Sequence, residues 1–186
     1  MKTNSVKNLM VPLSDYATVT EDASLSDVIQ ALTAAQERFC ANSKYPHMAV
    51  IILDKEGKVT GKVGQLDVLK ALEPKYQEML DREGLAKFGF SRTFMKSLLT
   101  NYHLWDSPLR DICLKGSSIP VSTFMDTPAS GEFIEEDATL DEAIHQLLLG
   151  QHRSLLVMKD GVVTGVIRLT DVFDSVARVI GECSLS

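Results

Sequence analysis

Long apolar runs, cysteine pairs and basic clusters are all scarce in this chain of 186 residues. No segment approaches the roughly 20 consecutive apolar residues that a membrane-spanning helix needs. The segment MKTNSVKNLMVPLSD at the start contains no long apolar stretch and no cleavage-site pattern, so we expect no signal peptide, no membrane span and a cytoplasmic location. The three cysteines, Cys40, Cys113 and Cys183, lie far apart, which disfavours a disulfide framework and a cysteine-type zinc site.

Basic residues are too few and too scattered for a nucleic-acid-binding face. The formal net charge is −6 at pH 7, whereas nucleic acid binding requires concentrated positive charge. A small anionic ligand stays possible, because one pocket can be basic on an acidic protein. The sequence also lacks a glycine-rich phosphate loop, an H-E-x-x-H motif, a G-x-S-x-G motif and a clustered Cys/His set. We therefore expect a non-catalytic protein without a metal site.

An internal duplication is the clearest feature that the sequence does contain. The repeated segments are VKNLM (Val6–Met10) and VSTFM (Val121–Met125), EDASL (Glu21–Leu25) and EDATL (Glu136–Leu140), and VTGKVGQLDVL (Val59–Leu69) and VTGVIRLTDVF (Val163–Phe173). The first two pairs are 115 positions apart and the third pair is 104 positions apart. The first copy therefore holds 11 additional residues, which we place within residues 34–47.

Each copy has the pattern of a β-α-β-β-α unit. The predicted elements of the first copy are an extended piece at 16–19, a helix after Ser24, strands at 49–53 and 58–63, and a helix that begins at Asp67. Those of the second copy are an extended piece at 131–134, a helix after Thr139, strands at 154–158 and 162–167, and a helix that begins at Asp171. An acidic residue three positions after Ser24 and Thr139 is typical of a capping box. One copy of roughly 60 residues would be marginally stable alone, so we expect the two to pack as a pseudo-symmetric pair.

Residues 73–120 separate the two copies and show helical spacing of apolar residues, such as Phe94 and Leu98. We expect helices here that pack on the repeats or on a second subunit; a surface for an unknown protein partner is the alternative. Trp105, the only tryptophan, is expected to anchor a core. The predicted domains are therefore a first repeat at 1–72, a helical insert at 73–120 and a second repeat at 121–186.

The duplicated unit resembles the cystathionine-β-synthase-type (CBS) domain pair, also called a Bateman module. The resemblance rests on Met10 and Met125, on the EDASL and EDATL helix starts and on the two V-T-G…D-V segments. It implies an α+β fold in which two CBS repeats form a flat pair, usually as a homodimer. It further implies a regulatory sensor rather than a catalyst. The implied ligands are adenosine compounds, such as AMP, ADP, ATP or S-adenosylmethionine, bound in clefts between the repeats.

The family motif has glycine, a serine or threonine three residues later, and an aspartate after three more. The aspartates that match are Asp67 and Asp171, and the resemblance implies that they bind ribose hydroxyls. Helix capping is the alternative role for both, since aspartate is favoured at helix starts. Gly64 and Arg168 stand where the family has the serine or threonine that contacts phosphate. This substitution leaves the usual phosphate contact without its hydroxyl in both copies.

Basic residues that could replace the lost phosphate contact gather in the second copy. A guanidinium binds phosphate by paired charge-assisted hydrogen bonds, so Arg168 is one candidate and a solvated surface arginine is its alternative role. Thr170 could supply a hydroxyl instead. His152 and Arg153 are similar to a His-Arg pair that contacts nucleotide phosphates in some family members, although either could be solvated. The first copy has no equivalent basic pair, so we predict at most one well-equipped anion site, in the second copy.

Val19 and Ile134, in the two opening strands, either pack against a nucleotide base or belong to the core. We predict a regulatory CBS-pair protein that binds an adenine nucleotide and signals by a ligand-dependent change in the arrangement of its repeats or of a homodimer. The alternative is a structural or protein-interaction dimerisation module with degenerate nucleotide sites. In that case the helical insert would be the functional surface.

Overall fold

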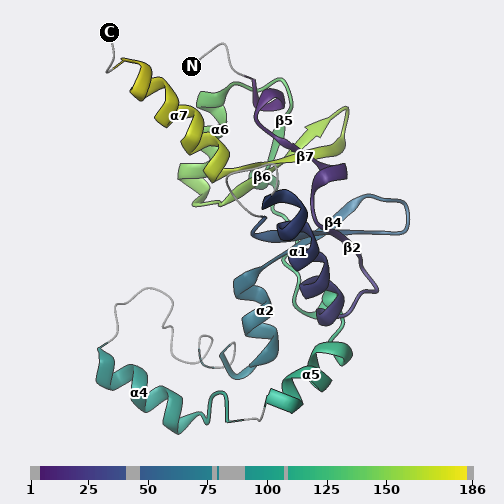
Figure 1. The fold of residues 1–186 in the computed structure, drawn as a ribbon, viewed down its shortest axis with the longest axis vertical. Helices are drawn as coiled ribbons and strands as arrows, with labels where there is room; N and C mark the ends of the chain where they lie inside the picture. The colour runs from purple at the N-terminus through teal and green to yellow at the C-terminus, as the bar shows by residue number, and fades with distance from the viewer. Residues whose placement is uncertain (1–4, 41–46, 77–78, 80–90, 107–108, 184–186) are drawn as a thin grey trace.

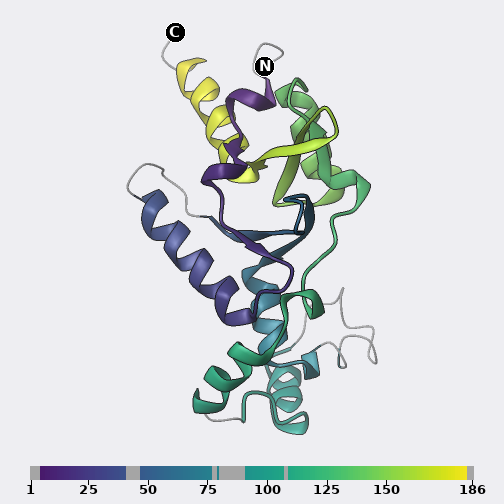
Figure 2. The same cartoon turned by 90° about the vertical axis from the view of Figure 1, so that its right-hand side faces the viewer.

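The computed structural model describes residues 5–40, 47–76, 79, 91–106 and 109–183. Two small β-sheets lie one above the other along the molecule, and further helices extend from one end (Figures 1 and 2). Each sheet is covered by helices of its own repeat. The fold is α+β with two β-α-β-β-α units, which confirms the fold class predicted from the sequence.

The two repeats contain the same elements in the same order. The first has β2 (Thr18–Thr20), α1 (Leu25–Cys40), β3 (Ala49–Leu53), β4 (Val59–Gly64) and α2 (Gln65–Leu72). The second has β5 (Phe133–Glu135), α6 (Leu140–Gly150), β6 (Ser154–Lys159), β7 (Val162–Arg168) and α7 (Leu169–Cys183). The remaining elements are the strand β1 (Val11–Pro12), the insert helices α4 (Arg92–Asn101) and α5 (Leu109–Ser118), and the 3₁₀ turns η1 (Val6–Asn8), η2 (Leu13–Asp15), η4 (Val121–Thr123) and η5 (Ser130–Glu132).

Local sequence signals specify the start of α1 and α6. The backbone N–H of Ser24 donates to Asp27 Oδ2 over 2.8 Å, and the backbone N–H of Thr139 donates to Glu142 Oε2 over 2.7 Å. Both hydroxyls donate to the same carboxylates, which confirms the predicted capping boxes. In the second repeat a tight turn joins β6 to β7, with Gly161 at φ 80°.

Two details of the sequence prediction differ from the structure. The helices α2 and α7 begin two residues before Asp67 and Asp171, because each strand passes directly into a helix. The aspartates therefore occupy the third helical position rather than the first. Part of the additional length of the first copy lies in α1, which has 16 residues against 11 in α6. The rest of the predicted 34–47 insertion includes residues 41–46, which lie outside the described residues.

Alternating side chains divide the strands between two kinds of core. Val50 and Ile52 of β3 pack toward α1 in the core of the first repeat. Ile51, between them, joins Leu156 of β6 in a third cluster that lies between the two sheets. Because successive side chains of a strand point to opposite faces, one strand serves both its own repeat and the contact between repeats.

Amino-terminal segments are exchanged between the repeats, which the sequence prediction did not include. Val6 is fully buried in the core of the second repeat, and its N–H donates to Ala138 O over 2.9 Å. Val121 is fully buried in the core of the first repeat, and its N–H donates to Ala23 O over 2.8 Å. β1 then pairs antiparallel with β7, and Asp126 pairs with Lys62 of β4 in the equivalent place. Each repeat thus completes the core of the other.

The duplicated V-T-G glycines lie where the exchanged segments cross the sheets. A Cβ on Gly165 would lie 2.6 Å from the Val11 carbonyl oxygen and 2.9 Å from Met10 Sδ. A Cβ on Gly61 would lie 2.6 Å from Met125 Sδ. Since real Cβ atoms do not approach so closely, both glycines are needed for close packing. The duplicated methionines and glycines are therefore contact partners across the repeats.

The insert continues from the end of α2 as predicted, and α5 packs against α1 and α2. Trp105 is 39% exposed, so the prediction that it anchors a core is wrong. Its backbone N–H donates to Glu73 Oε2 and its Nε1 donates to the Tyr76 hydroxyl, so polar contacts hold it at the surface. None of the helices in the described ranges is long and apolar enough to cross a membrane.

The glycine-to-alanine substitution should lower the free energy of unfolding by different amounts at Gly165 and at Gly61. Gly165→Ala should lower the free energy of unfolding by about 2–3 kcal/mol, because the new methyl group meets a backbone oxygen. Gly61→Ala should cost only about 1 kcal/mol, because the Met125 side chain can move. Gly181→Ala, which meets nothing within 4 Å, is the control and should not destabilise. Urea unfolding followed by circular dichroism checks this, and equal costs at both crossings would contradict it.

Candidate functional site

Asp67 and Asp171 occupy equivalent places, at the corner where the last strand of each repeat turns into a helix. Asp67 Oδ2 accepts from the Gly64 N–H over 2.9 Å, and Lys70 Nζ lies 3.4 Å from Asp67 Oδ1. Asp171 Oδ2 accepts from the Arg168 N–H over 3.3 Å. Both carboxylates therefore satisfy a backbone N–H at the start of their helices. Capping leaves further lone pairs on each carboxylate, so it does not exclude a ligand contact.

Arg168 is the residue that most distinguishes the second corner from the first. Its Nε donates to Asp171 Oδ2 over 2.7 Å and its Nη2 donates to Asp171 Oδ1 over 2.5 Å. Arg168 is only 5% exposed, so the alternative of a solvated surface arginine is wrong. At the first corner Gly64 has no side chain, and Asp67 pairs with the half-exposed Lys70 and lies within electrostatic range of Lys62. The two carboxylates are equally exposed, at 15%, but the cation beside Asp171 is a buried arginine and the one beside Asp67 is a half-exposed lysine.

Tyr16, from the segment that crosses between the repeats, lies within electrostatic range of this ion pair. Burial raises the pKa of Tyr16 to about 12, while the positive charge of Arg168 lowers this pKa and the negative charge of Asp171 raises it. The Tyr16 ring meets the fully buried His47 edge to face, with centroids 4.4 Å apart. The sequence prediction missed both residues. Aligning the two copies could have drawn attention to Tyr16, because the second copy has Gly131, which lacks a side chain, at the equivalent position.

The other predicted residues of the second repeat do not form one cluster with Arg168. Thr170 lies between Leu169 and Asp171 in the first turn of α7 and is half-buried. Arg153 has an exposed side chain, and its backbone carbonyl accepts from the Leu169 N–H over 2.9 Å. Arg153 therefore borders the corner through its backbone. His152 belongs to a separate pocket.

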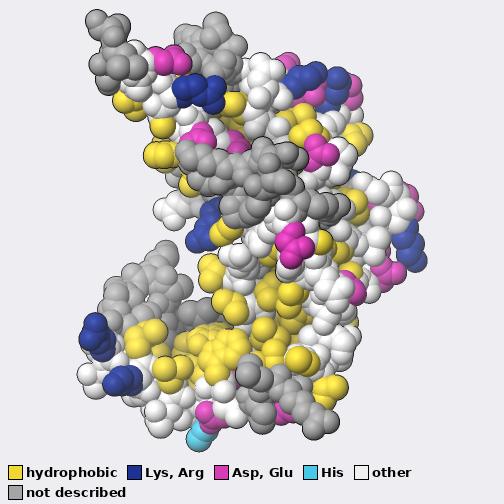
Figure 3. All heavy atoms as spheres, in the orientation of Figure 1, with side chains coloured by type: hydrophobic (Ala, Val, Ile, Leu, Met, Phe, Trp, Pro, Cys, Tyr) yellow, Lys and Arg dark blue, Asp and Glu magenta, His cyan; other side chains and the backbone are white. Residues whose placement is uncertain are grey.

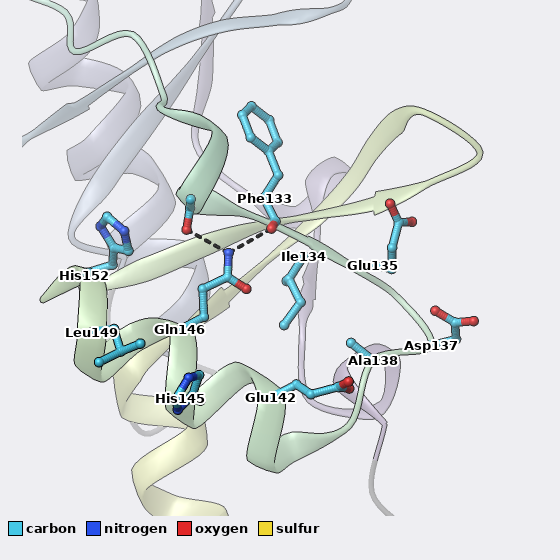
Figure 4. A pocket seen from close by; sticks show the side chains of 12 residues that line it. Phe133, Ile134, Glu135, Asp137, Ala138, Glu142, His145, Gln146, Leu149 and His152 are labelled. Carbon is cyan, nitrogen blue, oxygen red and sulfur yellow. Dashed lines mark hydrogen bonds between the residues drawn. The ribbon is translucent and has the colours of Figure 1, made fainter.

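A pocket of about 920 Å³ lies between α6 and β5, and we call it the α6–β5 pocket (Figure 4). Ile134 points from β5 toward α6, and His152 lies near the end of that helix. The amide of Gln146 donates to the carbonyl oxygens of Gly131 and Phe133 over 2.6 and 2.8 Å, which ties the helix to the strand. Ile134 is also a buried member of the core. Among the described residues, no group of three or more His, Cys, Asp or Glu side chains is placed to hold a metal ion.

A second pocket, of about 540 Å³, lies beside α2, and we call it the α2 pocket. Its lining residues are Asp67, Lys70, Ala71, Pro74, Ile119, Thr123, Phe124, Met125 and Asp126. Asp67 is thus the predicted site residue that faces this space. Gly64 is the residue before α2, and a Cβ there would lie 3.3 Å from Asp67 Oδ2. Val19 is partly buried and packs against the core of the first repeat.

A charged contact between the repeats was also absent from the prediction. Lys62 of β4 forms an ion pair with Glu132, which is buried and 8% exposed. Burial lowers the pKa of Lys62, and the negative charges of Asp126 and Asp67 oppose that shift. In the second copy the equivalent residues are Val166 and Ala17, both buried and apolar. The two faces of the repeat interface therefore differ in charge as well as at Arg168.

Comparisons with known proteins agree on the family and the fold. A model of the CBS domain matches residues 6–74 and 121–178. The CBS-pair protein CBSX2 from Arabidopsis thaliana is 18% identical, with a TM-score of 0.58 over 94% of this chain and 95% of that chain.

A structure described as CBSX2 in complex with AMP is 17% identical, with a TM-score of 0.56 over 94% of this chain and 97% of that chain. The CBS domain of a membrane protein from Sphaerobacter thermophilus is 15% identical, with a TM-score of 0.61 over 93% of this chain and 88% of that chain. At these identities the solved structures show a shared fold. No curated protein matches the sequence significantly.

The second crossing shows which residues can replace the buried Lys62–Glu132 pair, because Val166 and Ala17 occupy the equivalent positions there. Lys62→Val should lower the free energy of unfolding by about 1–3 kcal/mol, because Glu132 stays buried without its cation. The double variant Lys62→Val, Glu132→Ala copies the second repeat and should recover more than half of that loss. Lys159→Met removes a lysine from the exposed pair with Glu136 and is the control, with little change expected. Thermal and urea unfolding measure all three; a double variant as unstable as the single one would contradict the assignment.

Proposed function

The chain belongs to the CBS domain family, and on that premise we propose that it is a non-catalytic regulatory protein that binds an adenine nucleotide. The observation that carries the proposal is the repeated aspartate, Asp67 and Asp171, at the first helical turn after the last strand of each repeat. A carboxylate can accept hydrogen bonds from two vicinal hydroxyls of a ribose. The nearby helix amino-terminus favours an anion such as phosphate. The AMP found with the similar CBSX2 structure supports the same ligand class, with ADP, ATP and S-adenosylmethionine as further candidates.

The second repeat is the proposed phosphate-binding half. There Asp171 would bind the ribose and Arg168 the phosphate, with Thr170 and Arg153, which border the corner, as further candidate contacts. Arg168 is suited to this because a guanidinium and a phosphate form two parallel charge-assisted hydrogen bonds. His152 and Ile134 line the α6–β5 pocket instead, where the face of a nucleobase would pack against Ile134. Pockets of several hundred Å³ are in the range that small ligands use.

The first repeat is proposed to be the weaker or altered site. Asp67 lines the α2 pocket, Gly64 offers no side chain, and Val19 packs mainly in the core. The carboxylates of Asp67 and Asp126 balance the positive charges of Lys62 and Lys70 at this corner. An uncharged ribose-like group suits this environment better than phosphate does.

Ligand binding is proposed to signal through the contact between the repeats. The cluster of Val11, Tyr16, Ile51, Leu156 and Val166 lies between the two sheets, next to the Arg168–Asp171 corner. A ligand that binds one arrangement of this contact more tightly shifts the population toward it. We keep the predicted division into a first repeat (1–72), an insert (73–120) and a second repeat (121–186), with residues 6–12 and 121–126 exchanged between the repeats.

A second candidate function is a dimerisation or interaction module with degenerate nucleotide sites. The observation that favours it is the Asp171 carboxylate, which is already occupied by Arg168. The insert supports the same candidate, because apolar side chains gather on the concave side of α2, α4 and α5 (Figure 3). The exposed apolar residues of α4, α5 and the segment between them include Met95, Leu99, Trp105 and Leu114, each at least 39% exposed. We propose this surface as the one that an unknown protein partner would contact.

Homodimerisation is proposed for either function. An apolar stripe runs along α7 through Leu169, Phe173, Val176 and Ile180, with a spacing of three or four residues. Phe173 and Ile180 are 65% and 62% exposed. Such a stripe on one helix face is typical of a helix that packs against another helix. A second copy of the chain would bury this face.

Calorimetric titration of the ligand-free protein with AMP, ADP, ATP and S-adenosylmethionine tests the nucleotide function. We expect saturable binding by the wild type and at least a tenfold loss for Asp171→Asn, since an amide accepts ribose hydrogen bonds less strongly. Asp67→Asn should cost less, because the anion site is assigned to the second repeat. Unfolding curves show whether each variant stays folded. If pure wild-type protein binds none of these compounds, the nucleotide function is wrong and the interaction module is favoured.

Size-exclusion chromatography with light scattering tests the homodimer. The wild type should elute at twice the chain mass of 20.5 kDa. Phe173→Glu together with Ile180→Glu should give a monomer, because burying two carboxylates against a second copy is unfavourable. Val162→Glu, an exposed change in the β6–β7 turn region, is the control and should stay dimeric. A wild type that elutes as a monomer would contradict the proposal.

A further inference from the structure

A single neighbouring residue occupies most of the hydrogen-bond acceptor positions of the Asp171 carboxylate. Arg168 supplies three donors to it, namely its backbone N–H, its Nε and its Nη2. A carboxylate has about four lone-pair positions for hydrogen bonds. One position is left, whereas a ribose diol needs two. A diol therefore cannot bind Asp171 fully while the guanidinium stays in place.

Burial makes this occupation hard to displace by a neutral group. The side chains of Arg168 and Asp171 are 6% and 15% exposed, so water competes weakly for the pair. Charge-assisted bidentate pairs are among the strongest side-chain hydrogen bonds. A nucleoside without phosphate offers Arg168 no anion in exchange for Asp171. Separating the buried pair would then cost both side chains these hydrogen bonds without a replacement, which is strongly unfavourable.

The first repeat shows that this arrangement is specific to the second one. Asp67 accepts from the Gly64 N–H over 2.9 Å and pairs with the half-exposed Lys70 at 3.4 Å. No guanidinium can reach Asp67 from position 64, because that residue is glycine. Two carboxylates at the same place in the fold thus differ in whether they are internally occupied.

Building on the proposed nucleotide function, we propose that Arg168 is an internal latch on Asp171 that makes the second site selective for phosphorylated ligands. In the empty protein the guanidinium holds the carboxylate. A ligand with both a phosphate and a ribose diol accepts Arg168 through its phosphate and thereby releases Asp171 for the diol. A nucleoside alone must break the pair without replacing it.

Release of Asp171 by Arg168 would also affect the contact between the repeats. Tyr16 lies within electrostatic range of both charges and belongs to the cluster between the two sheets. It is part of the segment that crosses from one repeat to the other. A shift of the guanidinium from Asp171 to a phosphate therefore changes the surroundings of a residue that joins the repeats. This links the choice of ligand to the arrangement of the pair.

Titrations of the wild type, Arg168→Gly and Arg168→Met with adenosine and with AMP test the latch. Arg168→Gly copies the first repeat. Arg168→Met keeps more of the buried volume and serves as the test variant if the glycine variant does not fold. In the variants adenosine should bind roughly tenfold more tightly and AMP roughly tenfold more weakly than in the wild type, since one charge-assisted interaction is worth about that factor. Arg178→Met removes an exposed arginine from α7, the helix that follows Arg168, and should leave both affinities unchanged.

The results of these titrations distinguish a failure of the latch proposal from a failure of the nucleotide function. If the wild type binds AMP and the variants bind adenosine no more tightly, the latch is wrong and the nucleotide function stands. If the wild type binds neither compound but a variant binds adenosine, the latch is supported, and nucleotide binding by the wild type is wrong. If no folded form binds either compound, both proposals are wrong. A gain for adenosine in Arg178→Met would also overturn the latch, because the effect would then be general loss of charge.

Discussion

The exchange of amino-terminal segments between the repeats is the contact on which the rest of this structure depends. Val6 completes the core of the second repeat and Val121 completes that of the first. A repeat of this size buries too little apolar surface to be stable alone, and the exchange gives each repeat part of its partner's core. The close approach of Met10 to Gly165 and of Met125 to Gly61 follows directly from this crossing. The duplicated glycines are therefore explained by packing before any ligand is considered.

The crossing also brings the repeats close to each other's candidate sites. Toward the second repeat, the chain continues from β1 to Tyr16, within electrostatic range of Arg168 and Asp171. Toward the first repeat, it continues to Glu132, which pairs with Lys62 of β4. The backbone is the same in both directions, and the side chains are not. Duplication thus supplied two equivalent places. Substitution then gave the second repeat a buried Arg168–Asp171 pair and left Asp67 of the first repeat beside lysines and Asp126.

Capping and ligand binding are compatible roles for the two aspartates. Each uses one carboxylate oxygen to satisfy a backbone N–H at the start of its helix. Asp67 keeps free acceptor positions beside the α2 pocket, whereas Asp171 gives most of its positions to Arg168. The difference between the sites is therefore one of occupancy rather than of fold. It arises at a single position of the motif, three residues before each aspartate.

Sequence alone determined the duplication, the order of elements in each repeat, the capping boxes at Ser24 and Thr139 and the helical character of the insert, because these depend on local periodicity and on residues a few positions apart. It also singled out Asp67, Asp171 and Arg168 as candidate site residues. Only the tertiary structure decided that Val6 and Val121 exchange places, that Tyr16 and Lys62 face the sites, and that His152 lies apart from Arg168. It also decided that Arg168 is buried against Asp171. The two residues are only three positions apart, but the burial of the guanidinium depends on residues far away in the sequence and has no signature in local spacing.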